Sequence, residues 1–233
     1  MILDTASSPS VSITAATVDA PLQALPTGND MATLIAAKLC HDFISPTGAI
    51  VSGLELMDDP SAGDMHDEAL NLIRASVTKL AAIVAFARVA FGASTTAESF
   101  STTELKSLSE GMFAHIRGNL TWDISDQVLG KPAARALLNL AYIAGSALPM
   151  GGNATLTLEN AEREQIFSAH CAGNRARLKA EALTGLKGEP LTEGLTGQWI
   201  QPYWLWSIVN EAGGILSFDV ETDQVRFRMT LPK

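Results

Sequence analysis

Cysteine is scarce in this sequence of 233 residues, which contains only Cys40 and Cys171. Two thiols in otherwise apolar stretches do not make a disulfide scaffold, and they fit a reduced, cytoplasmic protein. Long hydrophobic runs are missing too, because charges interrupt each one before the roughly 20 residues that a membrane span needs. The N-terminus has no basic region ahead of a short apolar core, so we expect neither a signal peptide nor a membrane contact.

Basic residues are also few: 16 lysines and arginines stand against 25 aspartates and glutamates, a net charge of −9. No basic run interleaved with aromatic residues is available to follow a phosphate backbone, so nucleic acid is not an expected partner. The acidic balance favours solubility and disfavours binding to anionic lipid. Hydrophobic residues are plentiful at 47%, which is enough for one large domain or two small ones.

Hydrophobic periodicity divides the chain into three parts. Residues 1–29 are rich in Ser, Thr, Ala and Pro and have no helical period, which predicts a disordered tail. Asp30 is a candidate N-cap for a helix that runs to about Met57. A turn rich in Asp, Pro and Gly separates it from a second helix over residues 65–91. Two helices joined by a short turn predict an antiparallel hairpin over residues 30–92.

The second helix carries two apolar flanks. One is an a/d seam of residues three and four apart: Leu70, Ile73, Val77, Leu80, Val84, Ala87 and Phe91. Leu72, Ser76, Ile83 and Phe86 form the other flank, and Gly92 supplies a left-handed C-cap. A single hairpin covers only one flank, so we predict a homodimer in which two hairpins form a four-helix bundle. The alternative is that the rest of the same chain packs over the second flank.

Residues 98–233 have the pattern of a mixed domain. Five short apolar or alternating runs predict strands: 119–124, 154–158, 165–171, 215–220 and 224–231. Helical patterns lie between them: 103–117, 132–148 and 202–212. We therefore predict an α+β protein, in which helices of the C-terminal domain cover one face of a largely antiparallel sheet.

The first helix carries an unusual histidine, His41, which is followed at once by a carboxylate. The core stripe of this helix consists of Ile35, Leu39, Phe43, Ile50, Leu54 and Met57. At about 100° per residue, His41 lies about 200° from Leu39, so its imidazole is expected to face solvent. Gly48, Ser52 and Glu55 share the face of His41, where small side chains would let a partner's helix lie close.

The run from His41 to Pro46 resembles the phosphoacceptor box of histidine-kinase dimerisation domains: histidine, acidic residue, hydrophobic residue, variable residue, Ser or Thr, and Pro. The C-terminal half resembles the ATP-binding domain of the same kinases. Residues 133–144 are similar to the helix that carries the asparagine box. Residues 205–216 and 230–232 are similar to the last helix and the final two strands. Together the two resemblances cover about residues 30–233.

The residues that hold nucleotide in those kinases are missing. Four positions beyond Asn139, where the kinase pattern has a second asparagine for magnesium, stands Ile143. Residues 168–173 lack the aspartate that contacts the adenine amine. Residues 199–204 contain two tryptophans, a tyrosine and a proline in place of a glycine-rich lid whose backbone would cradle phosphates. We therefore expect no ATP binding and no intrinsic cofactor.

An intact histidine box beside a degenerate ATP-binding domain resembles the ChpT-type histidine phosphotransferases of alphaproteobacterial phosphorelays. The run from His41 through Gly53 and Glu55 is close to that family's signature. The resemblance implies that His41 relays phosphoryl groups from the receiver domain of a hybrid histidine kinase to response regulators that control the cell cycle. It also implies that Mg²⁺ is held by the receiver and not by this chain.

On this interpretation His41 is the nucleophile, because a neutral imidazole is nucleophilic near physiological pH. Asp42 accepts a hydrogen bond from the imidazole or from a receiver side chain and so fixes the tautomer. The alternative for Asp42 is an ordinary solvated carboxylate. The predicted docking strip for the receiver consists of Ser45, Gly48, Ser52 and Glu55. The alternative for the docking strip is a polar outer face without a partner.

Three other functions compete with this one. They are a histidine kinase with a divergent ATP site, a non-catalytic dimeric antagonist of a kinase or receiver, and a hydrolase using His41. The missing nucleotide residues oppose the first, the intact box opposes the second, and the lack of a nucleophile elbow opposes the third. A zinc site is not predicted either, because nothing in the spacing brings Cys40 and His41 to His170 and Cys171.

Overall fold

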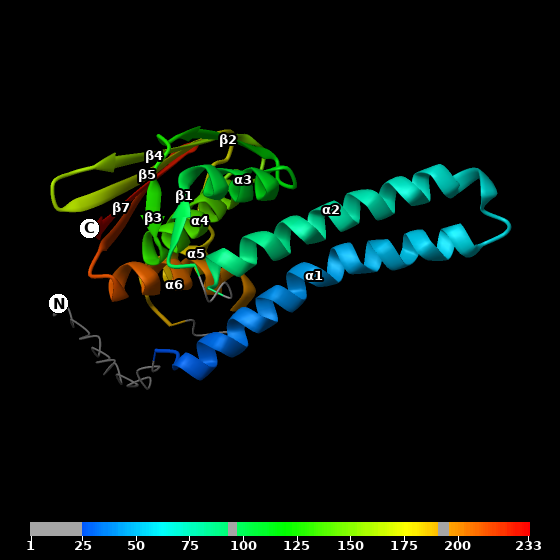
Figure 1. Ribbon diagram of the computed structural model, residues 1–233, viewed down its shortest axis with the longest axis horizontal. Coiled ribbons are helices and arrows are strands. Elements are labelled where there is room, and N and C mark those ends of the chain that lie inside the picture. Colours follow the sequence, from blue (N-terminus) through cyan, green and yellow to red (C-terminus); the bar gives the residue numbers. More distant parts are fainter. Residues whose placement is uncertain (1–24, 93–96, 191–195) are drawn as a thin grey trace, which may run out of the picture.

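The computed structural model describes residues 25–92, 97–190 and 196–233, which form a helical hairpin and an α+β domain (Figure 1). The hairpin consists of α1 (Gly28–Asp58), the 3₁₀ turn η1 (Gly63–Met65) and α2 (His66–Ala90). The domain follows in the order β1 (Ser99–Ser101), α3 (Thr102–Phe113), β2 (Gly118–Asp123), β3 (Val128–Gly130), α4 (Lys131–Ser146), β4 (Gly152–Asn160), β5 (Glu164–Ala172), α5 (Ala180–Leu186), α6 (Thr196–Glu211), β6 (Ile215–Glu221) and β7 (Gln224–Pro232). The predicted α+β class is confirmed.

The first helix begins with a capping box. The Thr27 hydroxyl accepts a hydrogen bond from the backbone N–H of Asp30 at 3.3 Å, and the Asp30 carboxylate accepts one from the backbone N–H of Thr27 at 2.9 Å. Thr27 is therefore the N-cap, and the assignment of that role to Asp30 is wrong, because its carboxylate closes the box from the third helical position. Residues 1–24 of the predicted tail lie outside the described residues, and the helix already begins at Gly28.

The two helices of the hairpin lie close together at Gly53. A Cβ atom at this position would lie 2.6 Å from Cγ1 of Ile73, so only glycine permits the contact. On α2, Ser76 and Ile83 are buried, whereas Val77 of the a/d seam is 50% exposed. The structure therefore buries the second flank except for Leu72, and it leaves Val77 and Val84 of the seam exposed. On α1, Leu54 was expected in the core stripe but is 51% exposed.

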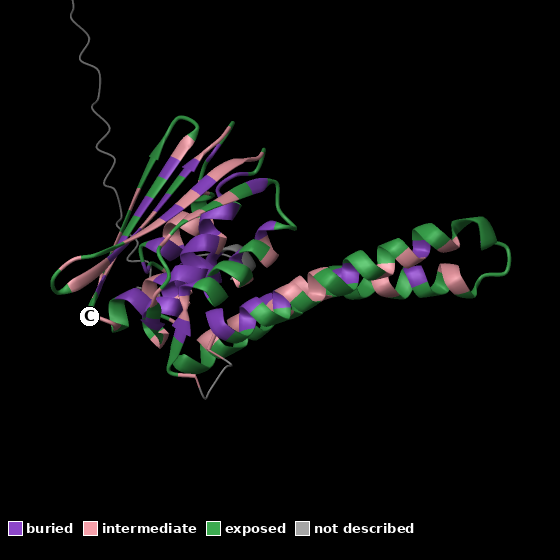
Figure 2. Ribbon diagram, turned by 45° about the horizontal axis from the view of Figure 1, so that its top comes forward, coloured by how far each residue is buried: buried purple, intermediate pink, exposed green. Residues whose placement is uncertain are grey.

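The apolar side chains of the hairpin are relevant to the prediction that no segment of the chain is long and apolar enough to span a membrane. By length and apolar composition alone, Gly28–Asp58 and Gly63–Ala90 are each long enough to cross a membrane, contrary to the expectation that charges interrupt every such run. Core helices of soluble proteins have the same length and apolar composition. Figure 2 shows that the free half of the hairpin is largely exposed, with a few buried positions between the helices.

The C-terminal domain is built on a five-stranded sheet with strand order β2-β4-β5-β7-β6. Only the β2–β4 pair is parallel, which confirms the prediction of a largely antiparallel sheet. Strand β7 alternates strictly, with Val225, Phe227 and Met229 buried and Arg226 and Arg228 exposed. One face of the sheet is therefore packed and the other is polar, as predicted for a sheet covered by helices on one side.

The core lies between the sheet and helices α3, α4 and α6 (Figures 1 and 2). Helix α4 is the central element, because 11 of its 16 residues are buried. Phe86, Val89 and Ala90, at the end of α2, belong to the same core. Gly92 follows with φ of 81°, the left-handed conformation expected of the C-cap glycine. The hairpin therefore shares a core with the domain.

Some elements of the domain differ from the sequence prediction. Strands β1 and β3 form a separate two-stranded ladder that was not predicted, and α5 was not predicted either. Helix α3 ends at Phe113, before the predicted end at residue 117. Helix α6 begins at Thr196, so Pro202 lies inside it and not in its first turn. Burial of Trp199 and Ile200 favours the earlier helical turn and offsets the hydrogen bond that proline cannot make.

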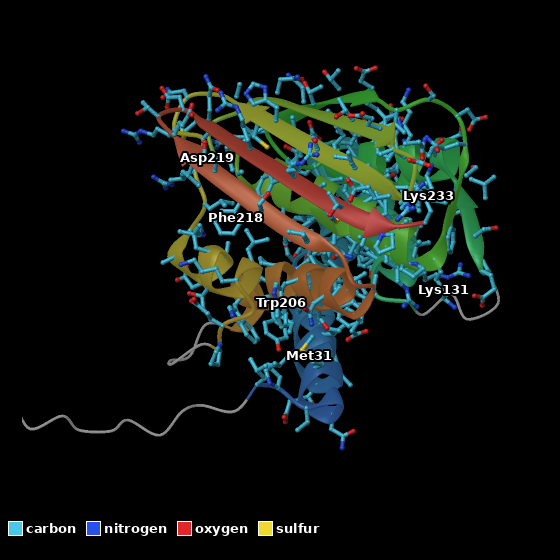
Figure 3. The ribbon with its side chains drawn as sticks, turned by 90° about the vertical axis from the view of Figure 1, so that its left-hand side faces the viewer. Met31, Lys131, Trp206, Phe218, Asp219 and Lys233 are labelled. Carbon is cyan, nitrogen blue, oxygen red and sulfur yellow. The ribbon has the colours of Figure 1, made fainter. Side chains whose placement is uncertain are left out.

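A second apolar cluster joins α6 to the start of α1. The aromatic cluster consists of Trp199, Ile200, Tyr203 and Trp206 of α6 with Met31, Leu34 and Ile35 of α1. Tyr203 lies at its centre, with its ring centroid 4.5 Å from that of Trp199 and 5.3 Å from that of Trp206. Figure 3 shows Met31 of α1 beside Trp206 below the sheet. The domain thus holds the hairpin both at the start of α1 and at the end of α2.

Replacing Tyr203 by alanine should release the first turns of α1. Removing a buried aromatic side chain typically lowers the free energy of unfolding by roughly 3 kcal/mol. Amide hydrogen exchange of residues 28–35 should accelerate in Tyr203→Ala, because these residues lose their packing partner. Leu156→Ala, which opens a cavity in the sheet core, is the control: it should lower stability without a selective effect on residues 28–35. Equal acceleration in both variants would contradict the role of the aromatic cluster.

Candidate functional site

His41 lies on the outer face of α1, about 13 residues from its start, and its side chain is 87% exposed. The predicted orientation of the imidazole toward solvent is confirmed. The helix continues through Pro46, which is buried and has no N–H to donate to the carbonyl of Asp42. The turn that carries His41 therefore lacks one helical hydrogen bond.

The imidazole is the end of a chain of polar contacts. His41 Nδ1 lies 3.3 Å from Oδ1 of Asp42. The other carboxylate oxygen, Oδ2, accepts a hydrogen bond from Nζ of Lys38 at 2.8 Å. Lys38 Nζ also lies 3.4 Å from the hydroxyl oxygen of Tyr142, on α4 of the C-terminal domain. Asp42 is 23% exposed, so it is a partly buried, paired carboxylate and not a freely solvated one.

Lys38 is the one charged residue that is buried in the described part of the chain, with 6% exposure. Burial lowers the pKa of its ammonium group, but Tyr142 and Asp42 oppose this effect and leave the pKa above its ordinary value. Lys38 is therefore protonated at neutral pH. Sequence reasoning missed this residue, although the spacing of four between Lys38 and Asp42 is a helical ion-pair signal. No sequence signal connects it to Tyr142, 104 positions away.

The predicted docking strip is exposed as a whole: Ser45, Gly48, Ser52 and Glu55. A Cβ atom built on Gly48 finds nothing within 4 Å, so the surface beside this glycine is open. Helical geometry places all four residues within about 40° of His41 around the axis of α1. The strip is thus a continuous surface beside the imidazole.

The residues at the positions that resemble the asparagine box of histidine kinases are buried inside the protein. Asn139 is fully buried, and its Nδ2 donates to the backbone oxygens of Ala90 and Arg135 at 3.0 and 2.8 Å. Its Oδ1 accepts a hydrogen bond from Nε2 of Gln201, a buried residue of α6, at 3.1 Å. Ile143, at the position of the missing second asparagine, is also buried. Asn139 therefore links helices where the kinase residue would serve a ligand.

The described residues contain no cluster of three His, Cys, Asp or Glu side chains that could hold a metal ion. Cys40 is exposed on α1, whereas Cys171 is buried in the domain core. Burial raises the pKa of the Cys171 thiol to about 12, so it is neutral at physiological pH. The two cysteine–histidine pairs noted in the sequence remain apart.

Comparisons with known proteins agree with these features. A family model for the histidine phosphotransferase C-terminal domain matches residues 102–224. The protein phosphotransferase ChpT of Brucella abortus (strain 2308) is 30% identical over 199 residues, which cover 85% of this chain and 94% of that protein. A solved structure of a bacterial phosphotransferase has 29% identity and a TM-score of 0.79, and the match covers 88% of this chain and 100% of that one.

These comparisons define the class of the protein, which is a phosphotransferase. The chain belongs to the histidine phosphotransferase family of the ChpT type, and it is a histidine phosphotransferase of a phosphorelay.

The contacts of Asn139 predict a structural role for this residue. Asn139→Ala should lower the free energy of unfolding by about 2 kcal/mol, because it removes three buried hydrogen bonds and leaves Gln201 unpaired. Urea denaturation measures this change. Asn119→Ala, at an exposed position of β2, is the matched control and should stay within about 0.5 kcal/mol of the wild type. Similar stabilities of the two variants would contradict the structural role.

Proposed function

We propose that this protein relays phosphoryl groups between receiver-domain aspartates through His41, in a two-component phosphorelay that controls the cell cycle. The observation that carries the proposal is the 87% exposed His41, paired with a carboxylate, on a chain whose nucleotide region is filled. The phosphoryl donor and acceptor are then other proteins: the receiver of a hybrid histidine kinase and downstream response regulators.

The proposed reaction moves one phosphoryl group in two reversible steps. A neutral His41 imidazole attacks the phosphorus of a receiver aspartyl phosphate, so that a nitrogen–phosphorus bond forms and the bond from phosphorus to the aspartate oxygen breaks. The receiver keeps its carboxylate, and the ring keeps its proton at the other nitrogen, where Asp42 accepts it in a hydrogen bond. The second step reverses these changes on another receiver.

This chemistry needs positioning and charge neutralisation more than covalent assistance. We propose that the receiver supplies the Mg²⁺ and that this chain needs no cofactor of its own. Asn139 supports that view, because its Nδ2 and Oδ1 are both used in contacts between helices. Ile143 offers no oxygen to a cation.

The label-transfer experiment for this function uses a phosphorylated receiver domain from a hybrid kinase of the same genome. Radiolabel should pass from the receiver to the wild-type protein and should not pass to His41→Ala, which lacks the nucleophile. His115→Ala removes another exposed histidine and should accept label at the wild-type rate. Labelling of His41→Ala, or no labelling of the wild type by any receiver of the genome, would overturn the proposal.

We also propose that the protein works as a homodimer whose hairpins form a four-helix bundle. The hairpin leaves large apolar side chains open on both helices: Ile44, Val51, Leu54, Leu72, Val77 and Val84. On α1, Ile44, Val51 and Leu54 fall within about 80° of one another, so they form one face beside the docking strip. A second hairpin would remove these side chains from water.

A glutamate in place of Val77, an exposed apolar residue of α2, should break the dimer, because its charge would be buried in an apolar interface. In Val77→Glu the mass measured by light scattering should fall from twice 24.6 kDa to 24.6 kDa. Asn71→Glu, at an exposed position of α2 about 120° from Val77 and about 100° from Leu72 around the helix, should remain dimeric. A wild type that is monomeric at all concentrations, or a dimeric Val77→Glu, would contradict the proposed bundle.

The docking strip is proposed as the surface on which a helix of the receiver lies. Gly48→Trp fills the open surface beside Gly48 and should slow transfer on the order of tenfold or more, because it displaces the receiver from His41. Gly63→Trp provides a control with the same substitution at another open glycine, in the turn at the far end of the hairpin. The transfer rates of the wild type and of both variants are measured over the same series of receiver concentrations. A wild-type transfer rate in Gly48→Trp would contradict the proposed docking strip.

We propose a cytoplasmic location, with no direct role for nucleic acid or for a membrane. The supporting observations are the net charge of −9 and the apolar faces of the hairpin, for which a second copy of the chain is a sufficient partner.

A further inference from the structure

Lys38, the buried partner of Asp42, has no part in the function as described so far. Lys38 is 6% exposed, and its ammonium group has two described oxygen partners: Asp42 Oδ2 at 2.8 Å and the Tyr142 hydroxyl at 3.4 Å. A buried charge is costly, and a chain retains it without loss of stability only where its partners are well placed. Stability alone therefore does not explain why the Lys38 charge is buried at this place.

Tyr142 is itself fixed by the domain and by α2. Its ring centroid lies 6.0 Å from that of Phe86, a buried residue of α2. The ammonium group of Lys38 lies 5.0 Å from the centroid of the Tyr142 ring, within the range of a cation–π interaction. The Lys38 ammonium is thus held between α1 and α4.

The consequence for His41 follows from hydrogen-bond capacity. An ionised carboxylate can only accept, so the 3.3 Å contact between His41 Nδ1 and Asp42 Oδ1 requires the proton to be on Nδ1. The other nitrogen, Nε2, then carries the free lone pair. Because Lys38 binds Oδ2 of the same carboxylate, it fixes the orientation in which Oδ1 faces the ring.

We propose that Lys38 and Tyr142 are positioning residues for phosphotransfer, which hold the Asp42 carboxylate against Nδ1–H of His41 so that Nε2 is the attacking nitrogen. The inference rests on the proposed function of His41. It gives the C-terminal domain a chemical use without nucleotide, since α4 of that domain sets the direction of the acceptor side chain. No further group or cofactor is needed, because the residues act through hydrogen bonds alone.

The test combines a spectroscopic and a kinetic measurement on the full chain. Protein labelled with [¹⁵N]histidine has four histidines, and His41→Ala identifies the signal of His41. Nitrogen chemical shifts above the titration range report which ring nitrogen carries the proton. The second measurement is the rate of label transfer from a phosphorylated receiver. Lys38→Met, Lys38→Arg and Tyr142→Phe are compared with the wild type.

The wild type should show the Nδ1–H tautomer of His41. In Lys38→Met the tautomer should shift toward Nε2–H, and the transfer rate should fall on the order of tenfold, as for other residues that orient a reactive group. Lys38→Arg should retain most of the Nδ1–H tautomer and most of the transfer rate. Tyr142→Phe should lose less of each than Lys38→Met does. Lys106→Met removes the lysine of an exposed pair with the same spacing, Lys106–Glu110, and should change neither measurement.

Loss of the fold does not account for the expected changes. Methionine has a similar length and suits a buried site, and Asp42 is 23% exposed and so reaches water when Lys38 is absent. Thermal unfolding of Lys38→Met should match the wild type. A wild-type tautomer or a wild-type transfer rate in Lys38→Met would overturn the positioning role alone. If no receiver of the genome labels the wild type, the proposed function itself is overturned. The role of Lys38 and Tyr142 in transfer is then overturned with it.

Discussion

The contact between the hairpin and helices α4 and α6 is the constraint on which the rest of the structure depends. The aromatic cluster around Tyr203 holds the start of α1, and the main core takes in the end of α2. Between these two anchors, Lys38 joins the turn that carries His41 to Tyr142. A hairpin that could swing relative to the domain would break all three contacts at once. The site is therefore built on a rigid junction and not on a free helix.

The same junction accounts for the altered nucleotide region. In α6, Trp199 and Tyr203 face α1 where a glycine-rich lid would otherwise be expected, and Gln201 binds Asn139 in the interior. Each of these side chains joins two helices. The packed helices thereby support the turn that carries His41.

Periodicity in the sequence predicts the hairpin, most strands and the exposed face of His41, because these follow from local patterns of apolar residues. It misses β1 and β3, which have three residues each, and the early start of α6, where Pro202 suggests a helix boundary. It assigns the N-cap to Asp30, although Thr27 and Asp30 are both residue types that suit an N-cap. Only the hydrogen bonds between the two residues show that Thr27 has this role. The pair of Lys38 and Tyr142 depends on long-range packing, so no local pattern indicates it. The exposed positions of the docking strip follow from helix geometry alone.

The central claim is that His41 receives phosphoryl groups from another protein and never from nucleotide. The most direct test incubates the protein with Mg²⁺ and γ-labelled ATP, and then adds a phosphorylated receiver carrying a second, distinguishable label. The account predicts no label from ATP, no saturable nucleotide binding by calorimetry, and acid-labile label on His41 from the receiver. Label from ATP on His41, lost in His41→Ala, would contradict the account and make the protein a histidine kinase with an unrecognised nucleotide site.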